Sequence, residues 1–310
     1  MKFIETLKNI WKIEDLRSRL LTTILFVLIY RFGSFIVLPG IDPTALTALK
    51  SQTSGGLLAL LDMFSGGAFA NASVFALGIM PYISASIVIQ LLTIAVPYFQ
   101  KMQREGESGR RKMNQYTRYL TVIILLLQGP SYLINLSVQL AQAGSALPSG
   151  FWFTASTTLI LAGGSMFVMW LGERITDKGI GNGISFIILV GIISRFPGAV
   201  IKEFASRLTD AGGGLVMFLV EVVFLLLVIA ASIMLVQGTR KIPVQYAKRV
   251  VGNKQYGGVR QYIPLKINAA GVMPIIFAQA IMFIPITLAG FTHSEAVNSF
   301  VGAFMNNNGF

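Results

Sequence analysis

The sequence predicts an all-α protein, a polytopic transmembrane helical bundle of seven spans, and three observations point to this fold class. Hydrophobic residues make up 54% of the 310 residues and charged residues only 12%, about half the charged share of a typical soluble domain. Mean hydropathy is +0.68. Seven windows are apolar over the roughly 20 residues that a helix needs to cross a bilayer core of about 30 Å.

These windows define the expected spans, which are taken in chain order. They lie at about 18–39, 72–97, 119–140, 152–172, 184–201, 214–237 and 267–291. Within the second window, Gly78 and Pro81 are expected to weaken the helix near its middle. A shorter apolar run at 57–67 contains Asp62 and cannot span, so we expect a half-helix packed inside the protein. Residues 1–17 are expected to form an amphipathic helix on the cytoplasmic leaflet.

The distribution of basic residues predicts the orientation of the bundle. Lys and Arg number 25 against 13 acidic residues. If the N-terminus is inside, 20 of these 25 fall on the cytoplasmic side. The largest groups lie between spans two and three and between spans six and seven. Because cytoplasmic loops retain Lys and Arg, we expect a cytoplasmic N-terminus, with 98–118 and 238–266 also in the cytoplasm.

Several classes of chemistry lack their residues in this chain. It contains no cysteine and a single histidine, His293, which excludes disulfides, thiol catalysis and clusters of Cys or His that bind metal. The glycine-rich run 179–183 lies between two spans rather than between a strand and a helix, so we expect a tight cytoplasmic turn and no nucleotide site. No cofactor is expected, and energy for transport would come from a partner or a gradient.

Three charged side chains lie more than one turn inside the apolar windows, namely Arg31, Arg195 and Glu221. Intramembrane charges usually mark function, but an ion-coupled transporter generally keeps several such groups near the midplane. We therefore expect these three to act in helix packing or at the membrane interface.

Two basic segments, 100–112 and 238–266, are expected to protrude from the cytoplasmic face. The second carries seven basic and no acidic residues. Such segments determine topology and contact lipid headgroups, and they are also suited to docking a large anionic partner, such as ribosomal RNA or an acidic soluble motor.

Four motifs make the chain resemble the SecY family, the channel subunits of the bacterial protein translocase. They are MFSGGA (63–68) leading into FALGIMPYISASIVIQLLT (75–93), EGESGRRK (105–112) followed by QYTRY (115–119), MWLGERITDKGIGNGIS (169–185) and PLKINAAGVMPIIFA (264–278). The similarity runs in order through nearly the whole chain.

The resemblance implies a fold of ten spans in two pseudo-symmetric halves of five, which surround an hourglass pore and open laterally between spans two and three on one side and seven and eight on the other. It divides this chain into the helix 1–17, an N-terminal half 18–201 and an incomplete C-terminal half 214–310. Since only seven spans are recorded, we expect the natural reading frame to continue.

The resemblance also implies roles for particular residues. The pore ring would consist of Ile79, Ile83, Ile188 and Ile276. The polar cluster of the lateral gate would consist of Ser84, Gln128 and Asn268. The half-helix at about 57–70 would be the plug, with Leu60, Leu61, Met63, Phe64, Gly66 and Gly67. Partner contacts would come from Arg104, Arg110, Arg111, Lys112, Arg240, Lys241, Lys248, Arg249, Lys254 and Arg260.

The function implied is a passive, non-enzymatic channel in the plasma (inner) membrane, which translocates unfolded secretory polypeptides and releases membrane segments laterally. The implied partners are SecE and SecG, the SecA motor, the ribosome, signal sequences with nascent chains, and membrane lipids. The alternative is an ion-coupled secondary transporter with a small-solute site at the broken second span. A transporter needs convergent polar groups, whereas the sequence shows an apolar constriction and large docking loops.

Overall fold

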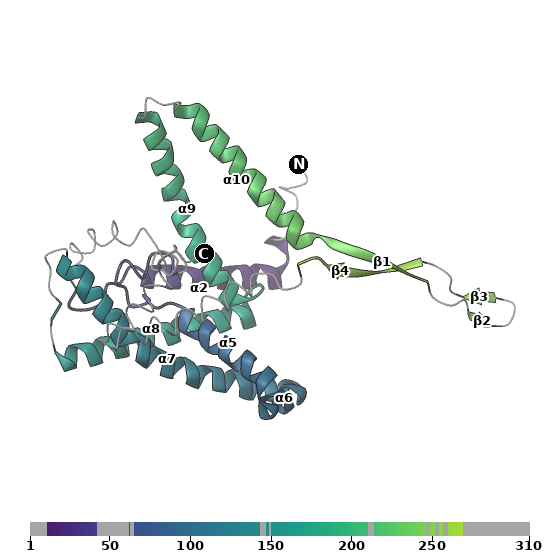
Figure 1. The fold of residues 1–310 in the computed structure, drawn as a ribbon, viewed down its shortest axis with the longest axis horizontal. Helices are drawn as coiled ribbons and strands as arrows, with labels where there is room; N and C mark the ends of the chain where they lie inside the picture. The colour runs from purple at the N-terminus through teal and green to yellow at the C-terminus, as the bar shows by residue number, and fades with distance from the viewer. Residues whose placement is uncertain are drawn as a thin grey trace, which may run out of the picture. The chain divides into compact units, whose positions relative to one another are not determined.

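A computed structural model describes most of the chain. The described residues are 11–41, 62, 65–142, 147–148, 150–209, 214–245, 249–251, 254–256 and 260–268. They form seven helices and four strands (Figure 1). The described chain falls into two compact units, one ending at Pro197 and the other beginning at Gly198. The seventh predicted span lies almost wholly outside the described residues, as do residues 1–10.

The first predicted span is helix α2, Glu14–Gly33, so its boundaries differ from the predicted 18–39. It begins four residues earlier, within the stretch assigned to the amphipathic helix 1–17. It ends at Gly33, a position with no room for a side chain, because a Cβ there would lie 2.0 Å from the Cε2 atom of Phe75. Ser34 caps the end, since both its N–H and its hydroxyl donate to the Tyr30 carbonyl, at 3.1 and 3.0 Å.

The second predicted span, 72–97, is wrong at its start. The helix α5 covers only Met80–Ala95, with Pro81 in its first turn, where a proline is well tolerated. Gly78 stands at φ +54°, a left-handed conformation that no α-helix continues through. The two residues expected to kink a helix therefore mark its beginning, and residues 65–79 form hydrogen-bonded turns instead.

Helix α6, Pro97–Arg104, follows α5 at a bend of 99°. Val96 between them is extended, with φ −113° and ψ 119°, as expected of a residue that precedes proline. The apolar α5 thus turns sharply into a short helix that ends in basic residues, within the stretch predicted to be cytoplasmic.

Spans three to six are confirmed as long helices. They are α7 Glu107–Gln142, α8 Phe151–Lys178, α9 Gly183–Thr209 and α10 Gly214–Gln237. Among the described residues these four are long and apolar enough to cross a membrane, and the bent pair of α5 and α6 qualifies as a fifth if counted as one span. At 1.5 Å per residue, the 36 residues of α7 reach about 54 Å, so the helix extends beyond the bilayer core.

Within the first unit, α7 packs against α8 and α5, and α2 packs against α8 (Figure 1). Two apolar clusters fill the spaces between them. The turns at 72–79 contribute to both, with Ala72, Ala76 and Leu77 in one and Phe75 and Ile79 in the other. The non-helical segment therefore lies at the centre of the unit.

In the second unit, the segment after α10 is a β-hairpin, which the all-α prediction did not include. Strand β1, Thr239–Gln245, pairs antiparallel with β4, Arg260–Lys266, and beyond them β2, Arg249–Val251, pairs with β3, Lys254–Tyr256 (Figure 1). Ile242 faces Ile263 and Pro243 faces Tyr262 across the first pair. The sequence carries one signal that predicts the hairpin, because Gly252-Asn253 separates two short runs that suit strands.

Candidate functional site: an apolar constriction beneath a pinned loop

Three of the four predicted pore-ring residues belong to one apolar cluster. Ile79 is buried in it, and Ile83 and Ile188 pack against it half-buried. Ile79 and Ile83 lie one turn apart at the start of α5, where the Ile83 N–H donates to the Ile79 carbonyl at 3.1 Å. Ile188 comes from α9. Ile276 lies outside the described residues, and the role of the four as a ring stays a prediction.

The cluster also contains side chains that the sequence analysis missed, from α2 and α8. They are Tyr30, Val168, Leu171 and Ile175, together with Ile187 of α9. No motif singled them out, because one apolar residue in an apolar helix resembles another until the packing partner is known. In this structure the cluster brings together side chains from four parts of the chain.

A segment that consists of Asp62, which is helical, and residues 65–73, which form tight turns up to an isolated β-bridge at Ser73, lies against this cluster. It falls in the stretch expected to be the plug and is called the plug loop here. Of the predicted plug residues, Gly66 and Gly67 belong to it, whereas Leu60, Leu61, Met63 and Phe64 lie outside the described residues. Residues 65–70 form turns, so the predicted half-helix does not continue to residue 70. The turns need glycine, since Gly66 and Gly67 have φ of +65° and +93°, and a Cβ on Gly66 would lie 2.9 Å from the Cα of Gly191.

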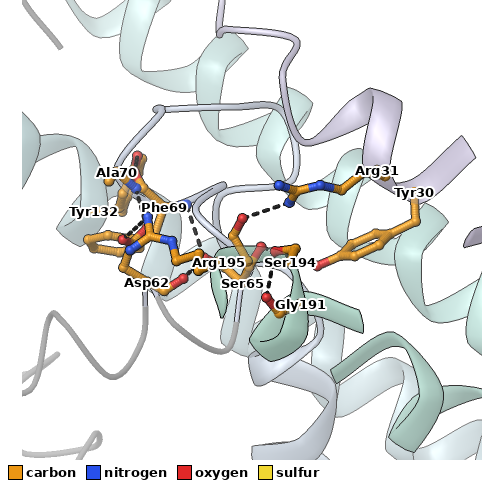
Figure 2. A network of polar contacts seen from close by, with 11 residues as sticks. Tyr30, Arg31, Asp62, Ser65, Phe69, Ala70, Tyr132, Gly191, Ser194 and Arg195 are labelled. Atoms are coloured by element: carbon orange, nitrogen blue, oxygen red, sulfur yellow. Dashed lines mark hydrogen bonds and ion pairs between the residues drawn. The ribbon is translucent and has the colours of Figure 1, made fainter. Parts of the chain in front are cut away.

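Side chains from two helices, α2 and α7, bind the backbone of the plug loop (Figure 2). From α2, the Tyr30 hydroxyl donates to the Ser65 carbonyl at 3.2 Å and Arg31 Nη1 to the Gly66 carbonyl at 2.7 Å. From α7, the Tyr132 hydroxyl donates to the Phe69 carbonyl at 3.0 Å. Each bond satisfies a carbonyl that a helix or strand would otherwise pair.

The loop also contains an ion pair with a third helix. The buried Asp62 carboxylate pairs with the guanidinium of Arg195, from α9, and its other oxygen accepts the Ala70 N–H at 2.8 Å. The sequence offered a signal for this contact that the analysis did not use. Asp62 and Arg195 are opposite charges in apolar surroundings, and such charges are usually paired.

The three intramembrane charges expected to have structural roles all have partners in the structure. Arg31 and Arg195 bind the plug loop, and Arg31 also stacks on the Phe35 ring, 4.9 Å from its centroid. Glu221 of α10 pairs with Arg207, which also pairs with Glu203 at 2.9 Å. Each charge is therefore accounted for by a contact within its own unit.

The predicted lateral-gate residues occupy different surroundings. Ser84 is half-buried on α5 and Gln128 is buried on α7, two helices that pack together. Asn268 follows β4 in the second unit. The structure brings the first two onto neighbouring helices, and the gate itself stays a prediction.

The predicted partner-binding residues gather in two places. Arg104 ends α6, and Arg110, Arg111 and Lys112 lie in the first turns of α7, all exposed. Arg240 and Lys241 are exposed on β1, Arg249 lies on β2, Lys254 on β3 and Arg260 on β4. Lys248 lies outside the described residues.

The predicted cytoplasmic turn 179–183 is confirmed as a tight reversal. Gly181 has φ +70°, and the Asn182 side chain accepts the N–H groups of Ile184 and Ser185 at 3.1 and 3.2 Å, capping α9. The turn also contacts α2, because the Thr23 hydroxyl oxygen accepts the Ile180 N–H at 3.2 Å.

Solved structures resemble this fold. The match to a SecY channel studied for the role of its plug domain in stabilising the closed state has a TM-score of 0.56 at 18% identity, covering 89% of this chain and 59% of that one. The match to the idle yeast Ssh1 complex bound to the 80S ribosome has a TM-score of 0.59 at 14% identity, covering 91% and 61%. The fold is that of the channel subunits of Sec-type translocation complexes.

Sequence comparison narrows this class to one family. The SecY family model matches residues 73–308. The chain is 43% identical over 296 residues to protein translocase subunit SecY of Streptomyces scabiei and 45% identical over 284 residues to that of Rickettsia conorii. These alignments cover 92% and 91% of this chain and 67% and 65% of the relatives, so the chain spans about two thirds of their length. The chain belongs to the SecY family.

Proposed function

We propose that this chain is the central subunit of a protein-conducting channel, which translocates unfolded secretory polypeptides and releases membrane-protein segments laterally. The observation that carries the proposal is the apolar constriction of Ile79, Ile83 and Ile188 with the plug loop pinned against it. A narrow ring of aliphatic side chains excludes water when empty and yields when a chain passes. Family membership supports the same function.

The channel is passive, and its partners supply the energy. We propose SecA or the ribosome as the driving partner, SecE and SecG as further subunits, and signal sequences and nascent polypeptides as the cargo. The exposed basic residues of α6, the start of α7 and the β1–β4 ribbon support docking of an anionic partner, because cationic side chains bind phosphates and acidic patches. A solved relative of the same fold is bound to a ribosome.

The alternative of an ion-coupled transporter is less well supported. Such a transporter needs ionisable groups that can bind and release a coupling ion. Here Arg195 and Asp62 pair with each other, as do Arg207 and Glu221. The segment proposed to hold a small-solute site, the start of α5, is lined instead by the apolar side chains of the constriction.

The test is transport itself, carried out on a channel of the length of the curated relatives, reconstituted in vesicles with the SecA motor and ATP. We expect a radiolabelled secretory precursor to become protected from added protease. A precursor lacking its signal sequence is the control and should stay accessible. Uptake of a small solute driven by an ion gradient, without protection of the precursor, would overturn the proposal.

We place the protein in the plasma (inner) membrane with its N-terminus in the cytoplasm, on the strength of the charge bias. Because the chain has no cysteine, single cysteines introduced as Asn114→Cys, Asn253→Cys and Ser145→Cys can be labelled in intact cells by an impermeant maleimide. We expect labelling of Ser145→Cys alone. Labelling of Asn253→Cys but not Ser145→Cys would refute the orientation.

A further inference from the structure

The plug loop is held by two arginines whose contacts differ in kind. Arg31 donates to the neutral Gly66 carbonyl, whereas Arg195 binds the Asp62 carboxylate (Figure 2). Of the contacts that described residues make with the plug loop, only the second joins two full charges. Both contacts are charge-assisted hydrogen bonds, because the donor is a guanidinium in each. The Arg195 contact adds the attraction between opposite charges, one of which is buried, and it is therefore the contact whose loss leaves a buried charge unpaired.

Asp62 organises the loop as well as binding Arg195. Its carbonyl accepts the Gly67 N–H at 2.9 Å and the Ser65 hydroxyl at 3.0 Å, and its carboxylate accepts the Ala70 N–H at 2.8 Å. Ser65, Gly67 and Ala70 are therefore all bonded to this one residue. Displacing Asp62 would break several bonds of the loop rather than one.

Gly67 makes room for the guanidinium. A Cβ at this position would lie 3.0 Å from Arg195 Nη2 and 3.3 Å from its Nε. One turn earlier in α9, the Cα of Gly191 would lie 2.9 Å from a Cβ on Gly66, and the Ser194 hydroxyl donates to the Gly191 carbonyl at 2.7 Å. The two loop glycines thus allow the close approach of α9.

The two partners differ in their exposure to water. The Asp62 side chain is 4% exposed and the Arg195 side chain 44%. A buried carboxylate that loses its cation keeps an unpaired charge away from water, at a large cost. A half-exposed guanidinium that loses its carboxylate turns to water at little cost. The stability of the seated loop should therefore depend on Arg195 more than on the charge of Asp62.

We propose that Arg195 is a positioning residue for the plug and that its ion pair with Asp62 is the latch that keeps the plug loop seated in the resting channel. The inference rests on the proposed function only in taking this loop as the plug. Release of the loop then requires α9 to withdraw Arg195, or a competing charge to replace it.

The test uses a thiol placed under the seated loop. Ala70 is 2% exposed and the chain has no cysteine, so Ala70→Cys should react with a maleimide only when the loop leaves its seat. Ala85→Cys, equally buried in α5, is the matched control for general loosening. Both reporters are made in the reconstituted channel of full family length, alone and combined with Arg195→Gln, Asp62→Asn and the double change.

We expect Arg195→Gln to raise the labelling rate at Ala70→Cys about tenfold, because the pair is only partly exposed, and to leave Ala85→Cys unchanged. Asp62→Asn should raise it less, since the amide oxygen still accepts the Ala70 N–H. The double variant should fall back to the level of Asp62→Asn, because no carboxylate is then left unpaired. Arg118→Gln, which breaks an ion pair away from the loop, should change neither reporter.

Unchanged labelling in Arg195→Gln, equal increases at both reporters, or a double variant that labels faster than Arg195→Gln would each overturn the latch. Precursor protection is measured on the same vesicles. The expected labelling pattern without protection supports the latch and overturns the channel proposal. Protection with unchanged labelling supports the channel and overturns the latch.

Discussion

Helices α8 and α10 are both long and apolar, yet one is packed by the protein and the other is not. Half of the most apolar window of α8 is buried, and none of that of α10. The buried positions of α8 include small and hydroxyl-bearing residues such as Thr157, Gly164 and Ser165, which allow close approach between helices. The buried face of α8 thus combines small residues with large apolar ones such as Leu161 and Leu171.

Helix α10 consists almost entirely of large aliphatic and aromatic side chains, and in the described chain none of its residues is buried. Lipid tails are as apolar as leucine, so such a surface needs no protein partner. The two helices show that the first unit is held by its own packing, whereas α10 is exposed in the part of the chain that the structure describes. The following predictions test this difference.

The largest effect is expected where a small residue is required for packing. A Cβ at Gly164 would lie 2.2 Å from the carbonyl oxygen of Val74, whereas nothing lies within 4 Å of one at Gly163. Gly164→Ala should destabilise the protein by about 1–3 kcal/mol, since the backbone of the central segment must move. Gly163→Ala should be neutral or slightly stabilising. Thermal unfolding in mild detergent measures both, and equal melting temperatures would contradict the role of small residues.

The second effect concerns the proposed constriction, whose residues lie in an apolar cluster of the first unit. Ile83→Asn places a hydrogen-bonding group where water is excluded and should make the resting channel leak ions, whereas Ile83→Leu keeps the apolar volume and should stay closed. Conductance of reconstituted channels measures the leak. Ile123→Asn on α7, a position 56% exposed, is the control. A leak in the control as large as in Ile83→Asn would show that Ile83 does not form the seal.

A third effect is expected on the surfaces that the protein leaves open to partners. Reversing Arg110, Arg111, Lys248 and Arg249 to Glu should weaken binding of the ribosome or SecA and flatten its dependence on salt, because fewer counterions are released. Sedimentation with membranes across a salt titration measures both quantities. Binding that keeps its affinity and its salt slope would place docking elsewhere.

The smallest effect is expected from an exposed ion pair between packed helices. Arg118 of α7 binds Glu173 of α8 through two bonds of 2.6 and 3.2 Å, but its side chain is 46% exposed. Arg118→Gln should therefore cost less than about 1 kcal/mol, below the cost of Gly164→Ala. Thermal unfolding in the same detergent compares them directly. A greater loss in Arg118→Gln would mean that charge rather than packing joins these helices.

Much of the helix layout was predictable, because the bilayer imposes a length and an apolar composition that can be read locally. The window at 214–237 coincides with α10, and the window at 152–172 lies within α8, which continues to Lys178. The windows failed at 72–79, where apolar residues form turns at the centre of the unit. Hydropathy reports that such a segment is buried, but Gly78 and Pro81 allow either a kinked helix or a new start, and only the contacts of Phe75 and Ile79 decide between them.

The candidate site was predictable to a similar extent. The resemblance placed Ile79, Ile83 and Ile188 together, and the structure finds them in one cluster. The hairpin was missed because strand pairing joins residues distant in sequence, and in a basic segment the alternation of apolar and polar side chains is weak. The Asp62–Arg195 pair was missed for a related reason. Asp62 was interpreted as part of a short half-helix and Arg195 as a charge in helix packing or at the membrane interface, and the two were not considered together.

The amino-acid sequence by itself determined that this is a multi-pass helical membrane protein and where most of its helices lie, because the cost of placing polar groups in lipid acts on each segment separately. It also determined family membership, through long motifs in order. The tertiary structure alone decided where the helix of the second span begins, which side chains meet at the constriction, and that Arg195 of α9 holds Asp62 of the plug loop. These are contacts between distant segments, and their energies exist only once the segments are packed together.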